Sequence, residues 1–185
     1  MKKCVLFVVV ILVVVGSFGC SSEPEPSDLF KSQALRFVEE ASKLKSMTEH
    51  GVSFVEYSSQ LSEVEGAYEL LDSLWTEGFE VETQENIEKA LEGWEWAEFL
   101  WDQKIEHYLS RITTDVDTRE YFDRIYDYAG DSLDINTGIV MIENEVTGEE
   151  ERIRSLPYDE NIVILFSLAS DYFDEAQSIL LQIIQ

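Results

Sequence analysis

Hydrophobic positions recur along the chain at alternating steps of three and four residues, a spacing typical of helices that bury one face. The first such segment covers residues 28–49, with Ser27 in the N-cap position and Gly51 just past its end. Its stripe consists of Phe30, Ala34, Phe37, Ala41, Leu44 and Thr48. We therefore expect an amphipathic helix over this segment.

The second segment begins with the clearest helix-start signal in the chain. Ser53 and Glu56 have the spacing of a capping box, in which each side chain accepts a hydrogen bond from the other residue's backbone N–H. The apolar positions that follow are Phe54, Tyr57, Leu61, Val64, Tyr68, Leu71 and Trp75. Gly78 marks the expected stop. This spacing suits a nearly antiparallel helix neighbour.

A third helix is predicted over residues 84–113, with Thr83 as its cap. Its core line consists of Ile87, Leu91, Trp94, Trp101, Ile105, Tyr108 and Ile112, flanked by Ala90 and Ala97. An acidic stripe, expected in solvent, comprises Glu88, Glu92, Glu95, Asp102 and Glu106. Gly66 and Gly93 each cost a helix interior about 1 kcal/mol relative to alanine. We expect them where a neighbouring helix or a bulky ring comes close.

Beyond Thr114 a shorter helix is expected over residues 117–129 and a long final helix over residues 159–184. Between them, residues 138–143 are rich in β-branched side chains, and residues 146–148 could turn the chain back into a second strand ending near Arg154. This insertion is either a β-hairpin or an irregular excursion. The final helix has a stripe of Ile162, Leu165, Ala169, Tyr172, Ala176, Ile179 and Ile183, widened by Phe166, Phe173 and Leu180. The sequence thus predicts a mostly α fold, an antiparallel four-helix-bundle-like domain with a short insertion before the last helix.

The N-terminal segment has the order of a secretory signal: Lys2 and Lys3, an apolar run over residues 4–15, and small residues before Cys20. The run is too short to span a bilayer, which takes about 20 apolar residues. The stretch around Cys20 resembles the lipobox of bacterial lipoproteins. The resemblance implies that Cys20 is lipidated and becomes the new N-terminus when the preceding segment is removed. Ordinary signal cleavage after Gly19, which leaves a free Cys20, and an uncleaved anchor are the alternatives.

This interpretation divides the chain into a signal peptide over residues 1–19, a lipid anchor and linker over residues 20–27, and an acidic helical domain over residues 28–185. Pro24 and Pro26 favour an extended linker of about 20 Å, at about 3 Å per residue. A serine directly after the cysteine, here Ser21, resembles the signal that sorts lipoproteins to the outer membrane. The resemblance implies an envelope location: the outer membrane facing the periplasm in a host with two membranes, and otherwise the outer face of the cell membrane.

A second resemblance lies at the start of the second predicted helix. Residues 51–57 resemble a G-[VI]-[ST]-[YF]-x-E-Y stretch of small, uncharacterised helical proteins of bacterial envelopes. The resemblance implies a helical bundle and no particular activity.

Charge narrows the class of partner. The 185 residues include 13 Lys and Arg against 38 Asp and Glu, which gives a formal net charge of −25. A nucleic-acid-binding surface needs clustered basic side chains, so no nucleic-acid partner is expected, and docking on anionic lipid by charge is disfavoured. An acidic surface favours a basic partner and speeds its association. Adaptation to high salt is the other origin of such a composition.

Residues suited to catalysis or metal binding are few. His50 and His107 lack the spacing of a metal site, and Cys20 is the last cysteine. One loop holds four oxygen ligands without the spacing of a calcium-binding loop: Asp131, Asp134, Asn136 and Glu143. The sequence has no nucleophile elbow, phosphate loop or dinucleotide fingerprint. We therefore expect no metal, no cofactor and no catalytic residue.

Two features near the middle of the third helix are candidates for a site. Glu98 interrupts the core line between Trp94 and Trp101, and an aromatic pocket would raise the pKa of its carboxyl group. Alternatively, Ala97 takes the core position and Glu98 lies at its edge. The second feature is a candidate surface for a ligand or partner. It combines Trp94 and Trp101 of the core line with three residues that lie off this line: Trp96, Phe99 and Leu100.

These observations favour a protein-binding or scaffold module, anchored by lipid in the cell envelope, and do not favour an enzyme. The expected partners are the membrane, through the lipid on Cys20, and a basic envelope protein. One alternative is a binder of a small apolar ligand between helices near residues 94–101. The other is a carboxylate-dependent hydrolase centred on Glu98.

Overall fold

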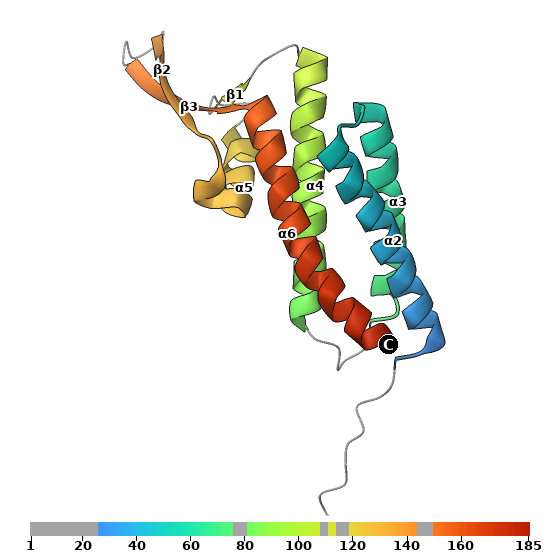
Figure 1. Cartoon of the computed structure of the whole chain (residues 1–185). Helices are drawn as coiled ribbons and strands as arrows, with labels where there is room; N and C mark the ends of the chain where they lie inside the picture. Colours follow the sequence, from blue (N-terminus) through green and yellow to red (C-terminus); the bar gives the residue numbers. More distant parts are fainter. Residues whose placement is uncertain (1–25, 76–80, 108–110, 114–118, 144–149) are drawn as a thin grey trace, which may run out of the picture.

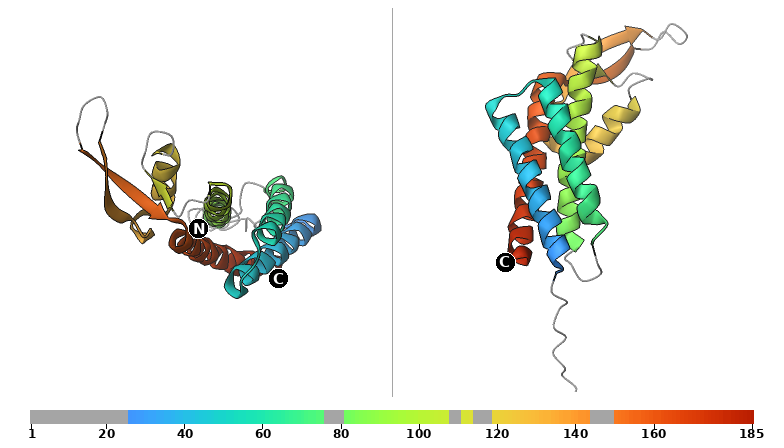
Figure 2. Two further views of the ribbon diagram at one scale, coloured as in Figure 1. Left: turned by 90° about the horizontal axis from the view of Figure 1, so that it is seen from above. Right: turned by 90° about the vertical axis from the view of Figure 1, so that its right-hand side faces the viewer.

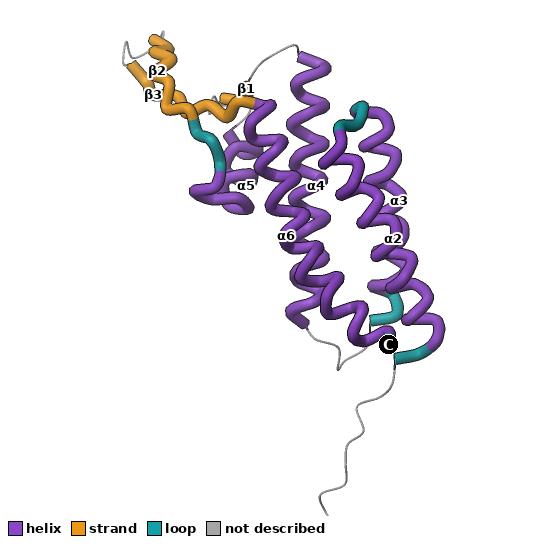
Figure 3. The backbone as a smooth tube through the Cα atoms, viewed as in Figure 1, coloured by secondary structure: helices purple, strands orange, loops and turns teal. Residues whose placement is uncertain are grey.

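A computed structural model of the chain describes residues 26–75, 81–107, 111–113, 119–143 and 150–185. Over these ranges the protein is mostly helical, with little strand (Figures 1 and 3). The helices are α2 (Asp28–His50), α3 (Phe54–Asp72), α4 (Val81–His107), α5 (Arg119–Ala129), η1 (Gly130–Ser132) and α6 (Tyr158–Ile184). The strands are β1 (Arg111–Thr113), β2 (Asn136–Glu143) and β3 (Glu150–Pro157).

The four long helices lie side by side, and each runs opposite to the one before it in the chain (Figures 1 and 2). All four contribute to a shared core, which includes Phe37 from α2, Tyr57 from α3, Trp94 from α4 and Phe173 from α6. These side chains are buried, and aromatic pairs link the helices: the ring centroids of Phe37 and Phe173 lie 6.2 Å apart. The apolar stripes of the sequence therefore converge on one interior.

The predicted starts of the first two helices are confirmed. At α2 the Ser27 hydroxyl accepts a hydrogen bond from the Phe30 backbone N–H at 3.1 Å, and Gly51 follows the helix with a φ of 85°. At α3 the capping box is complete: Ser53 Oγ accepts from the Glu56 N–H, and Glu56 Oε2 accepts from the Ser53 N–H at 3.2 Å. Local side-chain chemistry sets both boundaries.

The predicted bounds of the next helix are wrong at both ends. Helix α4 begins at Val81, so Thr83 is a buried residue of its first turn and not its cap. It ends at His107, and Ile112 lies in strand β1 opposite Leu156 of β3 instead of on a helical core line. Residues 112–114 are β-branched, which lowers helix propensity, and β1 gains backbone pairing with β3. Helix α3 also ends earlier than predicted, at Asp72, before Trp75. Gly78, the predicted stop of this helix, and Tyr108, on the predicted core line of the next, lie outside the described residues.

The insertion before the last helix consists of paired strands. Strand β2 is antiparallel to β3, with Val140 opposite Ile153, and β1 pairs with the other edge of β3. A register shift lies between Asn136 and Val140. The strands are at the end of the molecule where α6 begins (Figure 1). The expected turn at residues 146–148 lies outside the described residues.

Helix α5 packs against α4 and α6 and forms a second hydrophobic cluster there, which includes Trp96, Leu100, Phe122, Ile125 and Leu165. The stripe of α6 is rotated from the predicted one, because Phe173 and Leu180 are fully buried while Tyr172 and Ile179 are half-buried. The first half of α6 contributes Ile162 and Leu165 to the second cluster, and its second half contributes Phe173 and Leu180 to the shared core. Near its start, the buried Asn161 side chain donates to the carbonyl oxygens of Asp134 and Pro157 at 3.1 and 2.7 Å.

The two helical glycines differ. A Cβ atom at Gly93 would lie 2.9 Å from the Ala169 Cβ and would clash with the Tyr128 hydroxyl, so the expected close approach is confirmed there. At Gly66 no atom lies within 4 Å of such a Cβ, and the expectation is wrong. Only Gly93 is required by its neighbours.

Candidate functional site

A groove of about 340 Å3 runs between α3 and α4, and we call it the acidic groove. Its lining consists of Glu65, Tyr68 and Glu69 from α3, and Glu88, Leu91, Glu92 and Glu95 from α4. Residues three and four positions apart share a helix face, so the acidic faces of two helices meet here. Five of the seven lining residues are glutamates, and none is basic.

The sequence revealed only half of this groove. The predicted acidic stripe of the third helix included Glu88, Glu92 and Glu95, which line the α4 wall. The matching residues of α3, Glu65 and Glu69, were missed. Their four-residue spacing was the one available signal, and it does not tell which helix they face.

Burial and mutual repulsion raise the pKa of two carboxyl groups at the acidic groove. Desolvation raises the pKa of Glu65, and the negative charges of Glu98 and Glu69 raise it further. The pKa of Glu95 is also raised, by desolvation first and then by neighbouring glutamates, of which Glu65 has the largest effect. In the part of the chain that the structure describes, no lysine or arginine forms an ion pair with a groove glutamate. The negative charge of the acidic groove is therefore not balanced.

One side of the acidic groove is fixed by neutral donors. The Tyr68 hydroxyl donates to Glu88 Oε1 at 3.1 Å, and Gln84 Nε2 donates to the same oxygen at 3.3 Å. Burial and the nearby Glu88 charge raise the pKa of Tyr68, so its hydroxyl keeps its proton and remains a donor. These contacts orient the Glu88 carboxylate without adding positive charge.

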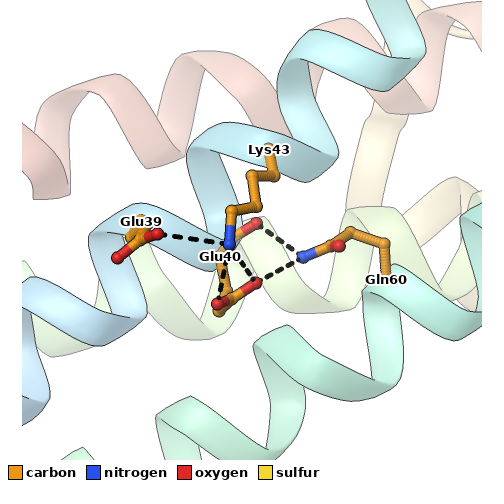
Figure 4. Close-up of polar contacts among 4 residues, drawn as sticks. All are labelled: Glu39, Glu40, Lys43 and Gln60. Carbon is orange, nitrogen blue, oxygen red and sulfur yellow. Dashed lines mark hydrogen bonds and ion pairs between the residues drawn. The ribbon is translucent and has the colours of Figure 1, made fainter.

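On α2, by contrast, glutamates are neutralised locally (Figure 4). Lys43 Nζ lies 3.0 Å from Glu40 Oε1 and 3.3 Å from Glu39 Oε1. Gln60 Nε2 of α3 donates to Glu40 Oε2 at 2.9 Å. The hydrogen bonds from Gln60 and Lys43 lower the pKa of Glu40, the opposite of the effect in the acidic groove. Some glutamates are thus neutralised by a neighbouring lysine, whereas those of the acidic groove are not.

The tryptophan-rich candidate surface is largely interior. Trp94 is fully buried in the core shared by the four long helices. Trp96 and Leu100 are buried in the second cluster, beneath α5 and the start of α6. The Arg124 guanidinium of α5 lies 5.0 Å from the centroid of the Trp96 ring, an additional cation–π contact. The residues off the predicted core line therefore meet other parts of the same chain.

The remaining two members of the candidate surface are half-buried and contact other rings. Phe99 lies against Tyr121 of α5, with ring centroids 4.7 Å apart. Trp101 contacts Phe54 and Phe166, with centroid distances of 5.8 and 6.3 Å. The structure brings these aromatic residues together as packing between helices, and the lining of the acidic groove contains no tryptophan.

Glu98 lies at the edge of the core. Ala97 is fully buried and Glu98 is half-buried next to it, the arrangement in which Ala97 takes the core position. The Glu98 charge adds to desolvation in raising the pKa of Tyr57, whose hydroxyl donates to the Trp94 carbonyl oxygen at 2.9 Å. The lining of the acidic groove contains neither Glu98 nor a serine or cysteine.

Metal binding finds no support among the described residues. Over those ranges no group of three or more His, Cys, Asp or Glu side chains could hold a metal ion. His50 is exposed at the end of α2, where its Nδ1 lies 2.8 Å from the Ser46 carbonyl oxygen. Asp131 and Asp134 are exposed, and the side chains of Asn136, Glu143 and His107 lie outside the described part of the chain.

A second groove, of about 320 Å3, lies between α2 and α6. Its lining combines Lys45, Glu49 and Asp171 with hydroxyl and apolar side chains. Lys45 Nζ also pairs with Asp174 Oδ1 of α6 at 2.6 Å. This groove contains both signs of charge and lacks the uniform negative lining of the acidic groove.

The anchor region falls outside the described residues. Nothing is described of the predicted signal peptide, of Cys20, or of the linker up to residue 25. Among the helices of the described ranges, none has the length and hydropathy needed to cross a bilayer.

Comparisons of the chain with protein-family models, with curated proteins and with solved structures find no match.

Proposed function

We propose that this is a lipid-anchored protein of the cell envelope that binds a basic partner protein through the acidic groove. In this proposal the four long helices form an antiparallel four-helix bundle, and the bundle is the rigid support of the groove. Lipid on Cys20 holds the module at the membrane surface, and the linker of about 20 Å keeps it close to that surface.

The acidic groove is the observation that carries the proposal. Its five glutamates have no ion-pair partner among the described residues, and the pKa values of Glu65 and Glu95 are raised. A lysine or arginine from a partner would relieve this repulsion and favour the charged carboxylates. The side chains of Tyr68 and Leu91 offer apolar surface for the methylene stem of such a side chain.

Neutralising the groove tests the binding proposal. We expect the triple variant Glu65→Gln, Glu69→Gln and Glu92→Gln to bind a lysine- and arginine-rich peptide more weakly than the parent protein, measured by fluorescence anisotropy at low salt. Exposed ion pairs contribute about 0.5 kcal/mol each, so three lost pairs weaken binding roughly tenfold. Salt should weaken binding to the parent protein more steeply than to the variant.

The control removes the same number of charges elsewhere. Glu63, Glu82 and Glu160 are exposed and do not line the acidic groove. Changing these three to glutamine should leave peptide affinity within about twofold of the parent value, because only long-range, screened attraction is lost. Equal losses in the two triple variants would show that net charge, and not the groove, attracts the peptide.

The anchor requires a separate test. Cells that produce the protein are supplied with radiolabelled palmitate, and we expect label in the parent protein and none in Cys20→Ala. The reason is that Cys20 supplies the thiol and the new N-terminus of a lipoprotein. An unlabelled parent protein would contradict lipid anchoring and leave the binding proposal standing.

A further inference from the structure

Leu35, Val55, Ile105 and Val163 are exposed elsewhere along the helices, and four further exposed aliphatic side chains lie at one end of the molecule. Each of the four long helices contributes one of them, close to its terminus. They are Leu29 of α2, Leu70 of α3, Val81 of α4 and Leu181 of α6, with exposed fractions of 55, 46, 68 and 38%. We call these four residues the apolar end. Figures 1 and 2 show that the helix ends carrying them lie together, at the bottom of Figure 1, opposite the strands.

Contacts between the helices hold this end together. The ring centroids of Phe30, in the first turn of α2, and Trp75, just after α3, are 5.6 Å apart. Gln84 Nε2, in the first turn of α4, donates to Asp72 Oδ1 at the end of α3 at 3.0 Å. Farther along α4, Asn86 Nδ2 donates to Glu175 Oε2 of α6 at 3.3 Å. The four exposed side chains are therefore carried by neighbouring helix ends.

The chain enters the helical domain at this same end. Ser27 caps α2, and Leu29, two residues later, is the first member of the apolar end. Cys20 lies seven residues before Ser27. A fully extended chain spans at most about 3.6 Å per residue, so Cys20 can be no more than roughly 25 Å from the start of α2. A bilayer that holds the lipid is thus within reach of the apolar end.

We propose that the apolar end rests on the surface of the lipid bilayer, with Leu29, Leu70, Val81 and Leu181 entering the headgroup region. The inference rests on the lipid anchor of the proposed function and adds a second membrane contact to it. The transfer of apolar side chains from water to the boundary between headgroups and acyl chains lowers the free energy. Such a contact would stand the helices upright and point the strands away from the membrane.

Charge at the apolar end selects the type of lipid. Asp28, Asp72, Glu82 and Glu85 are exposed near the same helix termini, and Lys31 is the one basic residue in the first two turns of α2. The surplus of carboxylates is repelled by the negative surface potential of anionic lipids. The geometry therefore favours a zwitterionic surface such as phosphatidylcholine or phosphatidylethanolamine.

The test places a tryptophan reporter at each end of the molecule. The full, lipidated chain is reconstituted in phosphatidylcholine vesicles with brominated acyl chains, which quench tryptophan fluorescence at short range. Val81→Trp carries the reporter in the apolar end. Val55→Trp is the matched control, because Val55 is also exposed, at 76%, but lies in the first turn of α3 at the opposite end.

We expect the emission of Val81→Trp to shift to shorter wavelength and to be quenched at least twofold more than that of Val55→Trp. Replacing part of the phosphatidylcholine by phosphatidylglycerol should reduce this difference, and salt should restore it. The other tryptophans are common to both variants, so their signals cancel in the comparison.

Three results would overturn the inference, and flotation of the vesicles distinguishes the first two. If both variants float with the vesicles and are quenched equally, the apolar end does not touch lipid although the anchor holds. If neither variant floats, the anchor itself is wrong and the membrane contact fails with it. The third result is obtained without vesicles. If the tryptophan emission of Val81→Trp already shifts to shorter wavelength and light scattering gives twice the mass of one chain, a second copy of the chain covers the apolar end.

Discussion

A side chain at position 93 would have to share space with the Tyr128 hydroxyl and the Ala169 methyl group. The Tyr128 hydroxyl donates to the Lys89 carbonyl oxygen at 3.0 Å, and a methyl at Gly93 would displace this bond. We expect Gly93→Ala to lower the free energy of unfolding by about 1–3 kcal/mol, as overpacking does in well-packed interiors. Urea unfolding followed by circular dichroism measures the change.

Gly66→Ala is the matched control for this substitution. No atom lies within 4 Å of a Cβ at Gly66, so alanine should raise the free energy of unfolding by about 0.5–1 kcal/mol through its better helix propensity. Opposite signs for the two variants are expected. A stabilising Gly93→Ala would mean that α5 and α6 give way without cost.

The same residues show what a sequence pattern can and cannot predict. Both glycines break the helical pattern equally, and only the positions of α5 and α6 distinguish them. Likewise, Trp96 and Leu100 are buried although they lie off the predicted core line. Helix α4 buries two faces, one toward the other long helices and one toward α5. Periodicity identifies the main buried face of a helix but does not reveal a second helix packed on its flank.

At the scale of elements, the best-predicted features depend on neighbours in the sequence. Ser27, Gly51 and the box of Ser53 and Glu56 are local signals, and the structure confirms each of them. The end of α4 depends on a distant partner. Residues 111–113, predicted to be helical, form strand β1 because β3, some forty residues later, pairs with them. The α3 wall of the acidic groove was missed for a related reason, since Glu65 and Glu69 gain meaning only when α4 is placed beside them.

The capping box of α3 gives a prediction at this scale. Ser53→Ala removes the oxygen that accepts the Glu56 N–H, so we expect a loss of about 1 kcal/mol in the free energy of unfolding. Hydrogen exchange should show faster opening of the first turn of α3. Ser59→Ala, an exposed position within the same helix, is the control and should leave stability unchanged or slightly higher. Equal effects at both serines would contradict a capping role.

For the whole molecule, the formal net charge of −25 makes stability depend on pH, and two groups of glutamates act in opposite directions. Glu65 and Glu95 have pKa values raised above 4.5 in the folded protein. The folded state therefore binds protons more readily, and stability rises as pH falls from 7 through these raised values. Glu40 and Glu56 have lowered pKa values, so their contribution is lost when pH falls below 4.5.

We therefore expect the melting temperature, measured by circular dichroism, to be highest at mildly acidic pH near 4.5 and to be lower at pH 7. The double variant Glu65→Gln and Glu95→Gln should melt a few degrees higher than the parent at pH 7 and show a flatter dependence between pH 4.5 and 7. Its control, Glu63→Gln and Glu82→Gln, removes the same charge from exposed positions outside the acidic groove. Identical slopes for the two variants would assign the pH dependence to diffuse repulsion, whereas a flatter slope for the groove variant alone locates the uncompensated charge between α3 and α4.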